Sequence, residues 1–202
     1  MKDCITFYIS FGSPFSYIAS QRIDDIALKH NKKILWRPVR LRNVLNVVYS
    51  DFNGINIPKS KLDYLRLDSK RMSNFYGLPF IPPDDDPPFD CDEVYNCVYS
   101  LADGNEDVLR NISLSIISSI WQKGIVLKNI DDIVSCLSKF YTSRNIIINS
   151  IKNKNGREWH NKSLSSAVDS GMIGSPWFTY KNDVFWGNDR LDYLDELINK
   201  LK

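Results

Sequence analysis

The residues of this chain best suited to chemistry are two serines near its N-terminus, in the sequence Ser13-Pro14-Phe15-Ser16. Two residues separate the hydroxyls, which is the spacing of a redox Cys-x-x-Cys motif with oxygen in place of sulfur. Dithiol–disulfide exchange needs one sulfur to attack and a second to resolve the mixed disulfide. Because this motif contains no sulfur, that exchange is excluded at this position.

The hydroxyl of Ser13 is expected at the start of a helix. Apolar and polar residues alternate over Ile5–Ser10, which predicts a strand, and apolar residues at helical spacing predict a helix from Pro14 to about His30. Proline suits the first helical position and serine suits the position before it. Since a helix N-terminus favours a bound anion, Ser13 is either a simple cap or part of an anion site.

A second segment, near the C-terminus, makes the anion site more plausible than the cap alone. Gly174-Ser175-Pro176 precedes a predicted hairpin that turns near Lys181-Asn182, and Trp186–Arg190 then leads into a final helix. A proline at the start of a strand often follows a cis peptide bond. With a further strand predicted at Lys33–Pro38, the two ends of the chain read β-α-β and β-β-α. This is the layout of a thioredoxin-like fold that carries a long insertion.

The insertion is predicted to be helical. Its apolar periodicity and its Gly and Asn breaks indicate helices over 59–76, 93–102, 106–123, 130–140, 143–153 and 157–170. A loop rich in proline and aspartate separates the first two of these helices. The apolar stripe of the helix over 106–123 is interpreted as core.

The chain resembles the 2-hydroxychromene-2-carboxylate isomerases and their relatives, the kappa-class glutathione transferases, within the thioredoxin-like superfamily. The matching residues fall in order along the chain: Ser13-Pro14-Phe15-Ser16-Tyr17, Ala19, Gln21-Arg22, Trp36-Arg37-Pro38, Lys61-Leu62-Asp63-Tyr64-Leu65, Asp68, Arg71, Tyr76-Gly77, Pro79, Gly174-Ser175-Pro176 and Trp186-Gly187-Asn188-Asp189-Arg190-Leu191. From about Asp84 to Lys162 only the helical character matches. We therefore expect an α/β, thioredoxin-like fold with a long all-helical insertion. Residues 1–52 and 166–202 would form the thioredoxin-like domain, and residues 53–165 the inserted helical domain.

The resemblance implies that glutathione is the cofactor. A glutathione sulfur beside Ser13 would have its pKa lowered by the helix dipole and by a hydrogen bond from the hydroxyl. Ser13 would then be catalytic as a thiolate stabiliser without being acylated, and Ser16 would be mostly structural. The other glutathione-binding residues are expected to be Ser175 for the cysteinyl backbone, Trp186, Gly187, Asn188 and Asp189 for the γ-glutamyl end, and Asn53 and Lys61 for the glycyl carboxylate.

For an isomerase, the resemblance implies reversible attack of the glutathione thiolate on a conjugated aromatic acid. This small aromatic substrate would lie in a cleft between the thioredoxin-like core and the insertion, with Phe11, Phe15, Tyr17 and Trp177 as candidate lining or as core. Two alternatives stay open: a kappa-type glutathione transferase or peroxidase, and a non-catalytic thioredoxin-like binding protein. Ser175, which replaces a usually aliphatic residue, gives the second alternative some weight.

Composition excludes other classes of function. The 202 residues are 43% hydrophobic and 25% charged, and a net charge of +2 is too small to indicate binding to nucleic acid or to a membrane surface. No apolar run approaches the length of a membrane span. Four scattered cysteines and two histidines give no metal-site spacing. We expect a cytoplasmic protein without a signal peptide or metal, and the resemblance implies a homodimer.

Overall fold

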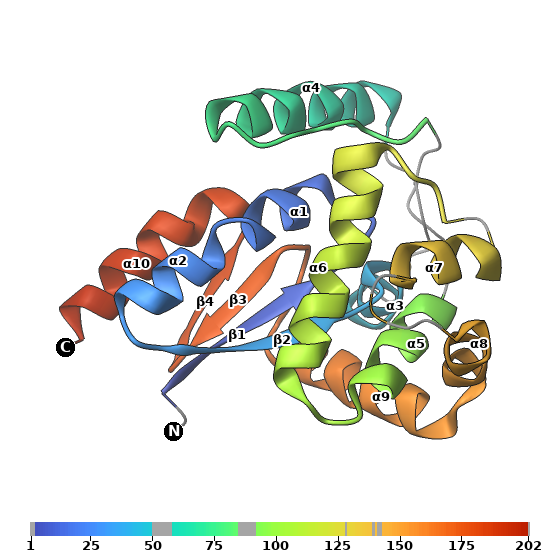
Figure 1. The fold of residues 1–202 in the computed structure, drawn as a ribbon. Coiled ribbons are helices and arrows are strands. Elements are labelled where there is room, and N and C mark those ends of the chain that lie inside the picture. Colours follow the sequence, from blue (N-terminus) through green and yellow to red (C-terminus); the bar gives the residue numbers. More distant parts are fainter. Residues whose placement is uncertain are drawn as a thin grey trace.

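The ends of the chain meet in a single sheet, as the sequence predicts. The computed structural model describes residues 3–49, 58–84, 92–127, 129–138, 140 and 143–201, and within them the strand order is β2-β1-β3-β4 (Figure 1). β1 (Cys4–Ile9) pairs in parallel with β2 (Lys33–Pro38) and antiparallel with β3 (Trp177–Tyr180). β3 and β4 (Asp183–Trp186) form the predicted hairpin. Because β1 and β3 are antiparallel neighbours, the loop after β1 and the loop before β3 lie at the same end of the sheet.

Helices make up most of the remaining described residues. They are α1 (Pro14–Ser20), α2 (Ile23–Lys29), α3 (Leu41–Val48), α4 (Lys59–Phe75), α5 (Asp92–Ala102), α6 (Glu106–Lys123), α7 (Ile130–Leu137), α8 (Arg144–Lys152), α9 (Lys154–Asp169) and α10 (Leu191–Lys200), with a 3₁₀ turn, η1, at Asn188–Arg190. The helices predicted within the insertion are confirmed to within a few residues at each end, and α3 was not predicted. None of the described helices combines the length and the apolar character that a membrane span requires.

The prediction of one helix from Pro14 to His30 is wrong, because the chain breaks between α1 and α2. At the break the backbone of Arg22 leaves the helical region, with φ −122° and ψ −28°. Its guanidinium donates to the carbonyl oxygen of Asn188 at 3.1 Å and to the carboxylate of Asp192 at 2.9 Å. The break therefore turns a cation toward η1 and the start of α10.

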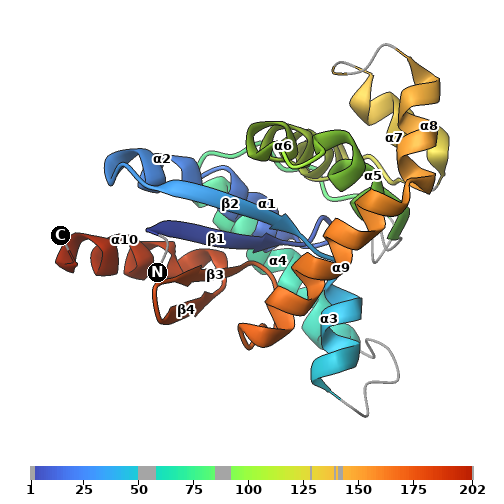
Figure 2. The same cartoon turned by 90° about the horizontal axis from the view of Figure 1, so that it is seen from below.

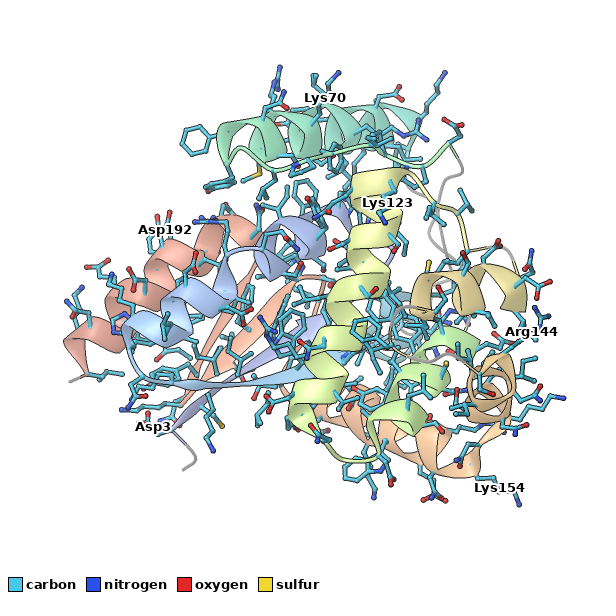
Figure 3. All side chains as sticks on the ribbon, viewed as in Figure 1. Asp3, Lys70, Lys123, Arg144, Lys154 and Asp192 are labelled. Atoms are coloured by element: carbon cyan, nitrogen blue, oxygen red, sulfur yellow. The ribbon has the colours of Figure 1, made fainter. Side chains whose placement is uncertain are left out.

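The two faces of the sheet pack against different helices. Ile5, Phe7 and Ile9 belong to a large core cluster that includes residues of α1, α2, α5, α6 and α10. Tyr8 and Trp177 lie on the opposite face and pack with residues of α3 and α9. The charged side chains labelled in Figure 3 extend outward from the ribbon. Helices of the insertion thus share a hydrophobic core with the strands that carry the chain ends.

Helices α5, α7 and α8 of the insertion lie beyond one end of the sheet, whereas α4 lies over α1 and α6 packs beside β2. Both views show α5, α7 and α8 together there, with α9 running back along them (Figure 1 and Figure 2). α9 approaches α5 closely at Gly156, where a side-chain carbon would overlap the carbonyl oxygen of Asn96 and lie 2.9 Å from the Cβ of Ser100. The absence of a side chain at Gly156 is therefore what allows this helix pair to form.

We expect Gly156→Ala to lower the free energy of unfolding by about 1–3 kcal/mol, because the added methyl forces α9 away from α5. The intrinsic helix propensity of alanine offsets part of this loss. Urea unfolding followed by circular dichroism would measure the change. Asn155→Ala, at the exposed neighbouring position, is the matched control and should change stability little. Equal effects of the two substitutions would contradict the close approach.

One turn after Gly156, His160 is buried between α9 and α5. Its ring stacks on Tyr95 with centroids 5.1 Å apart, and Nδ1 lies 3.3 Å from Oδ1 of Asn96. Burial lowers the pKa of His160 to about 4; the charge of Asp92 acts weakly in the opposite direction and that of Arg40 in the same direction. The imidazole is therefore neutral at pH 7.

The lowered pKa of His160 makes stability depend on pH. The unfolded chain binds this proton near pH 6.5 and the folded chain only near pH 4, so the stabilisation is complete above pH 6.5 and is lost as the pH falls. Between pH 7 and pH 5 the loss should approach about 2 kcal/mol. His160→Phe keeps an aromatic ring and removes the titration. In urea unfolding at both pH values, the wild type should lose more stability than this variant, and an equal loss would refute the assignment.

Candidate functional site

Ser13 lies where the sequence predicts, at the N-cap of α1. Its backbone is extended, with φ −105° and ψ 118°, and Pro14 follows at the first helical position. The hydroxyl Oγ accepts the backbone N–H of Ser16 at 3.2 Å and donates to the backbone oxygen of Ser175 at 3.1 Å. The cap is confirmed, and the same hydroxyl also joins the N-terminal helix to the C-terminal segment.

Ser175 is buried between β1 and α1. The bond between Ser175 and Pro176 is cis, as predicted for a proline before a strand. The hydroxyl of Ser175 accepts the backbone N–H of Ser10 at 3.0 Å and lies 2.6 Å from the hydroxyl of Ser16. We call Ser13, Ser16 and Ser175 the serine cluster. All three residues are at most 9% exposed, so their mutual hydrogen bonds satisfy groups that water does not reach.

The serine cluster can hold an anion but lacks a general base. Among the hydrogen bonds that join described residues, none links Ser13, Ser16 or Ser175 to a histidine or a carboxylate. Deprotonation of Ser13 for nucleophilic attack therefore has no evident acceptor. The Ser13 hydroxyl is instead fixed as an acceptor by Ser16 N–H, while its own proton is free to turn from the carbonyl of Ser175 toward a ligand.

The backbone of Ser175 was predicted to pair with the cysteinyl backbone of the ligand. In the structure its carbonyl oxygen already accepts the Ser13 hydroxyl. A carbonyl oxygen has two lone pairs, so a second donor from a ligand remains compatible with this contact. Ser16, assigned a mostly structural role, is fully buried and hydrogen-bonded within the cluster.

The loop after β4 lies directly beside the segment that contains Ser175. The backbone N–H of Gly187 donates to the carbonyl of Pro176 at 3.0 Å. The indole of Trp186 fills the space that a side chain at Gly174 would need. Gly187 has φ +107°, a conformation that residues with a side chain rarely adopt. Trp186 and Gly187 are thus brought next to the segment that carries Ser175, and their binding of the γ-glutamyl end stays a prediction.

Asn188 and Asp189 differ in how accessible they are. The side chain of Asn188 is buried and donates to the sulfur of Met72, on α4, at 3.6 Å. The carboxylate of Asp189 is half exposed and pairs with Arg190 at 3.0 Å. Asp189 is therefore accessible to a charged ligand group at the surface, whereas the side-chain nitrogen of Asn188 contacts α4 and leaves its amide oxygen and backbone for a ligand.

The residues predicted for the glycyl carboxylate lie on one segment of the chain. Lys61 is exposed in the first turn of α4, and α4 lies across α1 in Figure 1. Asn53 lies outside the described residues. The assignment of both residues to the glycyl end stays a prediction.

Most of the residues predicted to line the substrate cleft lie in the hydrophobic core. Phe11 and Tyr17 are fully buried, and Trp177 is 5% exposed. The hydroxyl of Tyr17 donates to the carbonyl of Pro79 at 2.6 Å, and the indole N–H of Trp177 donates to Ser170 at 3.0 Å. Phe15 is only partly buried and remains the one candidate of the four that the core does not fully enclose.

Two side chains that help to position the serine cluster were not predicted from the sequence to do so. The indole of Trp121 donates to the carbonyl of Phe11 at 2.9 Å, and the hydroxyl of Tyr95 accepts the N–H of Phe11 at 3.2 Å. Both come from the insertion and fix the backbone two residues before Ser13. The available signal was chemical: a tyrosine or tryptophan within an apolar helix face needs a hydrogen-bond partner when buried.

Comparison with known proteins identifies close likenesses over the whole chain. Residues 4–199 match the DSBA-like thioredoxin domain family. The 2-hydroxychromene-2-carboxylate isomerase of Sphingobium xenophagum is 26% identical over 200 residues, which cover 98% of this chain and 99% of the relative. The expected resemblance to these isomerases is thereby confirmed.

Two solved structures agree with the fold. The structure of 2-hydroxychromene-2-carboxylate isomerase (HCCA isomerase) matches with a TM-score of 0.84 at 24% identity, covering 98% of this chain and 95% of that one. The cytosolic disulfide reductase DsbM of Pseudomonas aeruginosa, solved with GSH, matches with a TM-score of 0.64 at 12% identity, covering 98% and 96%. At these identities the likenesses show the thioredoxin-like fold with its helical insertion.

The hydroxyls of Ser16 and Ser175 should stabilise the fold as a coupled pair. Ser16→Ala or Ser175→Ala alone leaves a buried hydroxyl with one partner fewer, and each should cost about 1–2 kcal/mol of unfolding free energy. The double variant should be less destabilised than the sum of the two, by about 1 kcal/mol. Urea unfolding of the four proteins measures this coupling. Strict additivity would mean that the 2.6 Å contact contributes nothing.

Proposed function

The chain belongs to the DSBA-like thioredoxin domain family, and on that basis we propose that it is a glutathione-dependent isomerase in which Ser13 stabilises the glutathione thiolate. The observation that carries the proposal is the Ser13 hydroxyl, held at a helix N-cap beside the cis Ser175–Pro176 bond. The position that a redox member of the family would use for sulfur here carries oxygen. A thiol therefore has to come from a ligand.

The thiolate would be stabilised by contacts that the structure already contains. The N–H of Ser16 fixes the oxygen of Ser13, so that its proton can turn from the Ser175 carbonyl to a sulfur. A hydrogen bond to the charged form lowers a thiol pKa, and so does the positive end of a helix. The proton that leaves the thiol goes to solvent, because none of the cluster's hydrogen bonds to described residues reaches a base.

The proposed reaction consumes nothing. The substrate is a 2-hydroxychromene-2-carboxylate-type aromatic acid, which opens to a cis enone conjugated with the ring. The thiolate adds to the benzylic carbon, a carbon–sulfur bond forms, and the electron pair of the double bond moves to the ketone oxygen as an enolate. Rotation about the new single bond is followed by loss of the thiolate, which restores the double bond in the trans form. Names of relatives at 26% identity support an isomerase of this type.

The other contacts with glutathione are proposed from where the candidate residues lie relative to Ser13. The Ser175 backbone would pair with the cysteinyl unit as a short strand addition. Trp186, Gly187, Asn188 and Asp189 would hold the γ-glutamyl end, where Asp189 offers a half-exposed carboxylate to the ammonium. Lys61 and Asn53 would hold the glycyl carboxylate. A disulfide reductase of the same fold solved with GSH supports glutathione as the ligand.

Ser13→Ala should lower the glutathione-dependent rate by about 10²–10³-fold, because it removes the one hydroxyl donor to the thiolate. The assay follows conversion of 2-hydroxychromene-2-carboxylate by absorbance, with and without glutathione. Ser20→Ala is the matched control, since it removes a buried hydroxyl of the same helix that donates only to the carbonyl of Tyr17. This control should retain activity.

The same assay separates the alternatives. An unchanged rate in Ser13→Ala would falsify the thiolate mechanism. Conjugation of 1-chloro-2,4-dinitrobenzene without turnover of the chromene acid would indicate a kappa-type transferase instead. If calorimetry detects no binding of glutathione at millimolar concentration, the protein would be a non-catalytic binding protein.

A further inference from the structure

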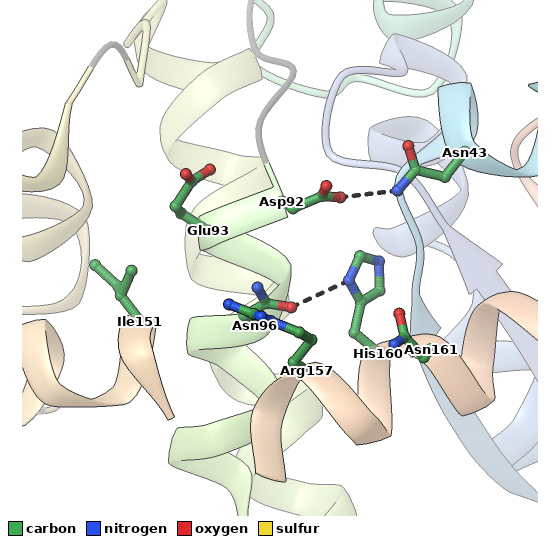
Figure 4. Close-up of a pocket in the computed structure, with 8 residues that line it drawn as sticks. All are labelled: Asn43, Asp92, Glu93, Asn96, Ile151, Arg157, His160 and Asn161. Atoms are coloured by element: carbon green, nitrogen blue, oxygen red, sulfur yellow. Dashed lines mark hydrogen bonds between the residues drawn. The ribbon is translucent and has the colours of Figure 1, made fainter. Parts of the chain in front are cut away.

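A cavity of about 400 Å³ lies between α3, α5, α8 and α9, away from the serine cluster (Figure 4). A volume of this size is within the range of small-molecule sites. Its lining is almost entirely polar, with Ile151 as the apolar exception: Asn43, Asp92, Glu93, Asn96, Ile151, Arg157, His160 and Asn161. Such a lining suits a ligand that carries several hydrogen-bonding groups.

One of the three charges in this lining is already neutralised. Asp92 accepts from Arg40 at 3.2 Å and from the amide of Asn43 at 2.8 Å. Glu93, on α5, and Arg157, on α9, are exposed at the mouth of the cavity and have no ion-pair partner within the described part of the chain. They lie on different sides of the space in Figure 4. One free anion and one free cation thus face a common cavity.

His160 adds an unmet acceptor. Its Nδ1 faces Oδ1 of Asn96 at 3.3 Å, so this nitrogen carries the proton of the neutral ring. The other nitrogen, Nε2, is buried without a hydrogen-bond partner among the described residues, although the side chain is only 3% exposed. A buried polar atom in the wall of a cavity is satisfied when a ligand donates to it.

We propose that this cavity binds a small zwitterion of the α-amino-acid type whose side chain ends in a hydrogen-bond donor. Arg157 would bind the carboxylate and Glu93 the ammonium, so that both free charges are paired. The donor at the far end of the ligand would meet Nε2 of His160. A zwitterion would pair both side chains, whereas a simple anion would leave Glu93, and a simple cation would leave Arg157, in contact with water alone.

The cavity is separate from the proposed glutathione site. None of the serine cluster lines it. Between them lies Tyr95, whose ring stacks on His160 at 5.1 Å and on Phe11 at 4.9 Å. The same tyrosine hydroxyl accepts the N–H of Phe11. The two sites therefore share a wall but no ligand-binding residue.

L-Glutamine is the probe that tests the proposal, by isothermal titration calorimetry of the full chain at millimolar ligand concentration. Wild-type protein should bind L-glutamine, and Arg157→Gln and Glu93→Gln should each weaken binding by about tenfold or more. Lys154→Gln, which removes an exposed charge from the same helix outside the cavity, should leave the affinity unchanged. Glutaramate, which lacks the ammonium, should bind at least tenfold more weakly than L-glutamine.

The side-chain donor is tested separately. L-Norvaline lacks the amide, so His160→Phe should weaken the binding of L-glutamine and leave that of L-norvaline unchanged. No binding of L-glutamine to the wild type would overturn the proposal, and so would equal binding of glutaramate. Loss of L-glutamine binding in Asp189→Asn would also overturn it, because the ligand would then occupy the γ-glutamyl end of the proposed glutathione site. Loss of isomerase activity alone in Ser13→Ala leaves this cavity's assignment intact.

Discussion

The hydrogen bond from the Ser13 hydroxyl to the carbonyl of Ser175 is the contact on which the candidate site depends. It joins residues 162 positions apart in the sequence. The contact is possible because β1 and β3 pair antiparallel, which places the loop after β1 and the loop before β3 at the same end of the sheet. Through this partner the helix cap becomes part of the proposed binding site. The loop at Trp186 and Gly187 is then attached through Gly174 and Pro176, so that three separated segments form one surface.

The proposed stabilisation of a thiolate at this surface depends on uncharged groups. In the proposed mechanism a thiolate beside Ser13 would meet a hydroxyl and backbone N–H groups. Among the residues that the structure describes, no lysine or histidine forms a hydrogen bond with the cluster. Dipoles of this kind stabilise an anion without neutralising it permanently, which suits a nucleophile that must add and then leave. The fixed orientation of Ser13 comes from Ser16 and, one step further out, from Tyr95 and Trp121, which hold Phe11. Two residues of the insertion thus hold in place the backbone that leads to Ser13.

Features that depend on local pattern could be predicted from the sequence. The alternation of apolar and polar residues correctly predicted strand β1, and the helical periodicity of apolar residues correctly predicted the helices of the insertion. The Ser13-Pro14 pair correctly predicted the N-cap of α1. The break at Arg22 could not be predicted, because the residues that its guanidinium contacts there, Asn188 and Asp192, are far away in sequence. The pairing of Ser16 with Ser175 was equally hidden, since it arises only when the ends meet. The roles of Asn53 and Lys61, and the division into domains at residues 52 and 165, stay predictions.

The packing of Trp186 against Gly174 has a practical consequence. Of the five tryptophans, Trp36, Trp121 and Trp177 are at most 5% exposed, whereas Trp186 is 53% and Trp159 44% exposed. Solvent-exposed indoles emit at longer wavelength than buried ones, so the long-wavelength fluorescence of this protein comes from two positions only. Trp186 borders the serine cluster and Trp159 lies on α9, so that replacing Trp159 alone leaves a chain whose long-wavelength emission reports on the loop after β4.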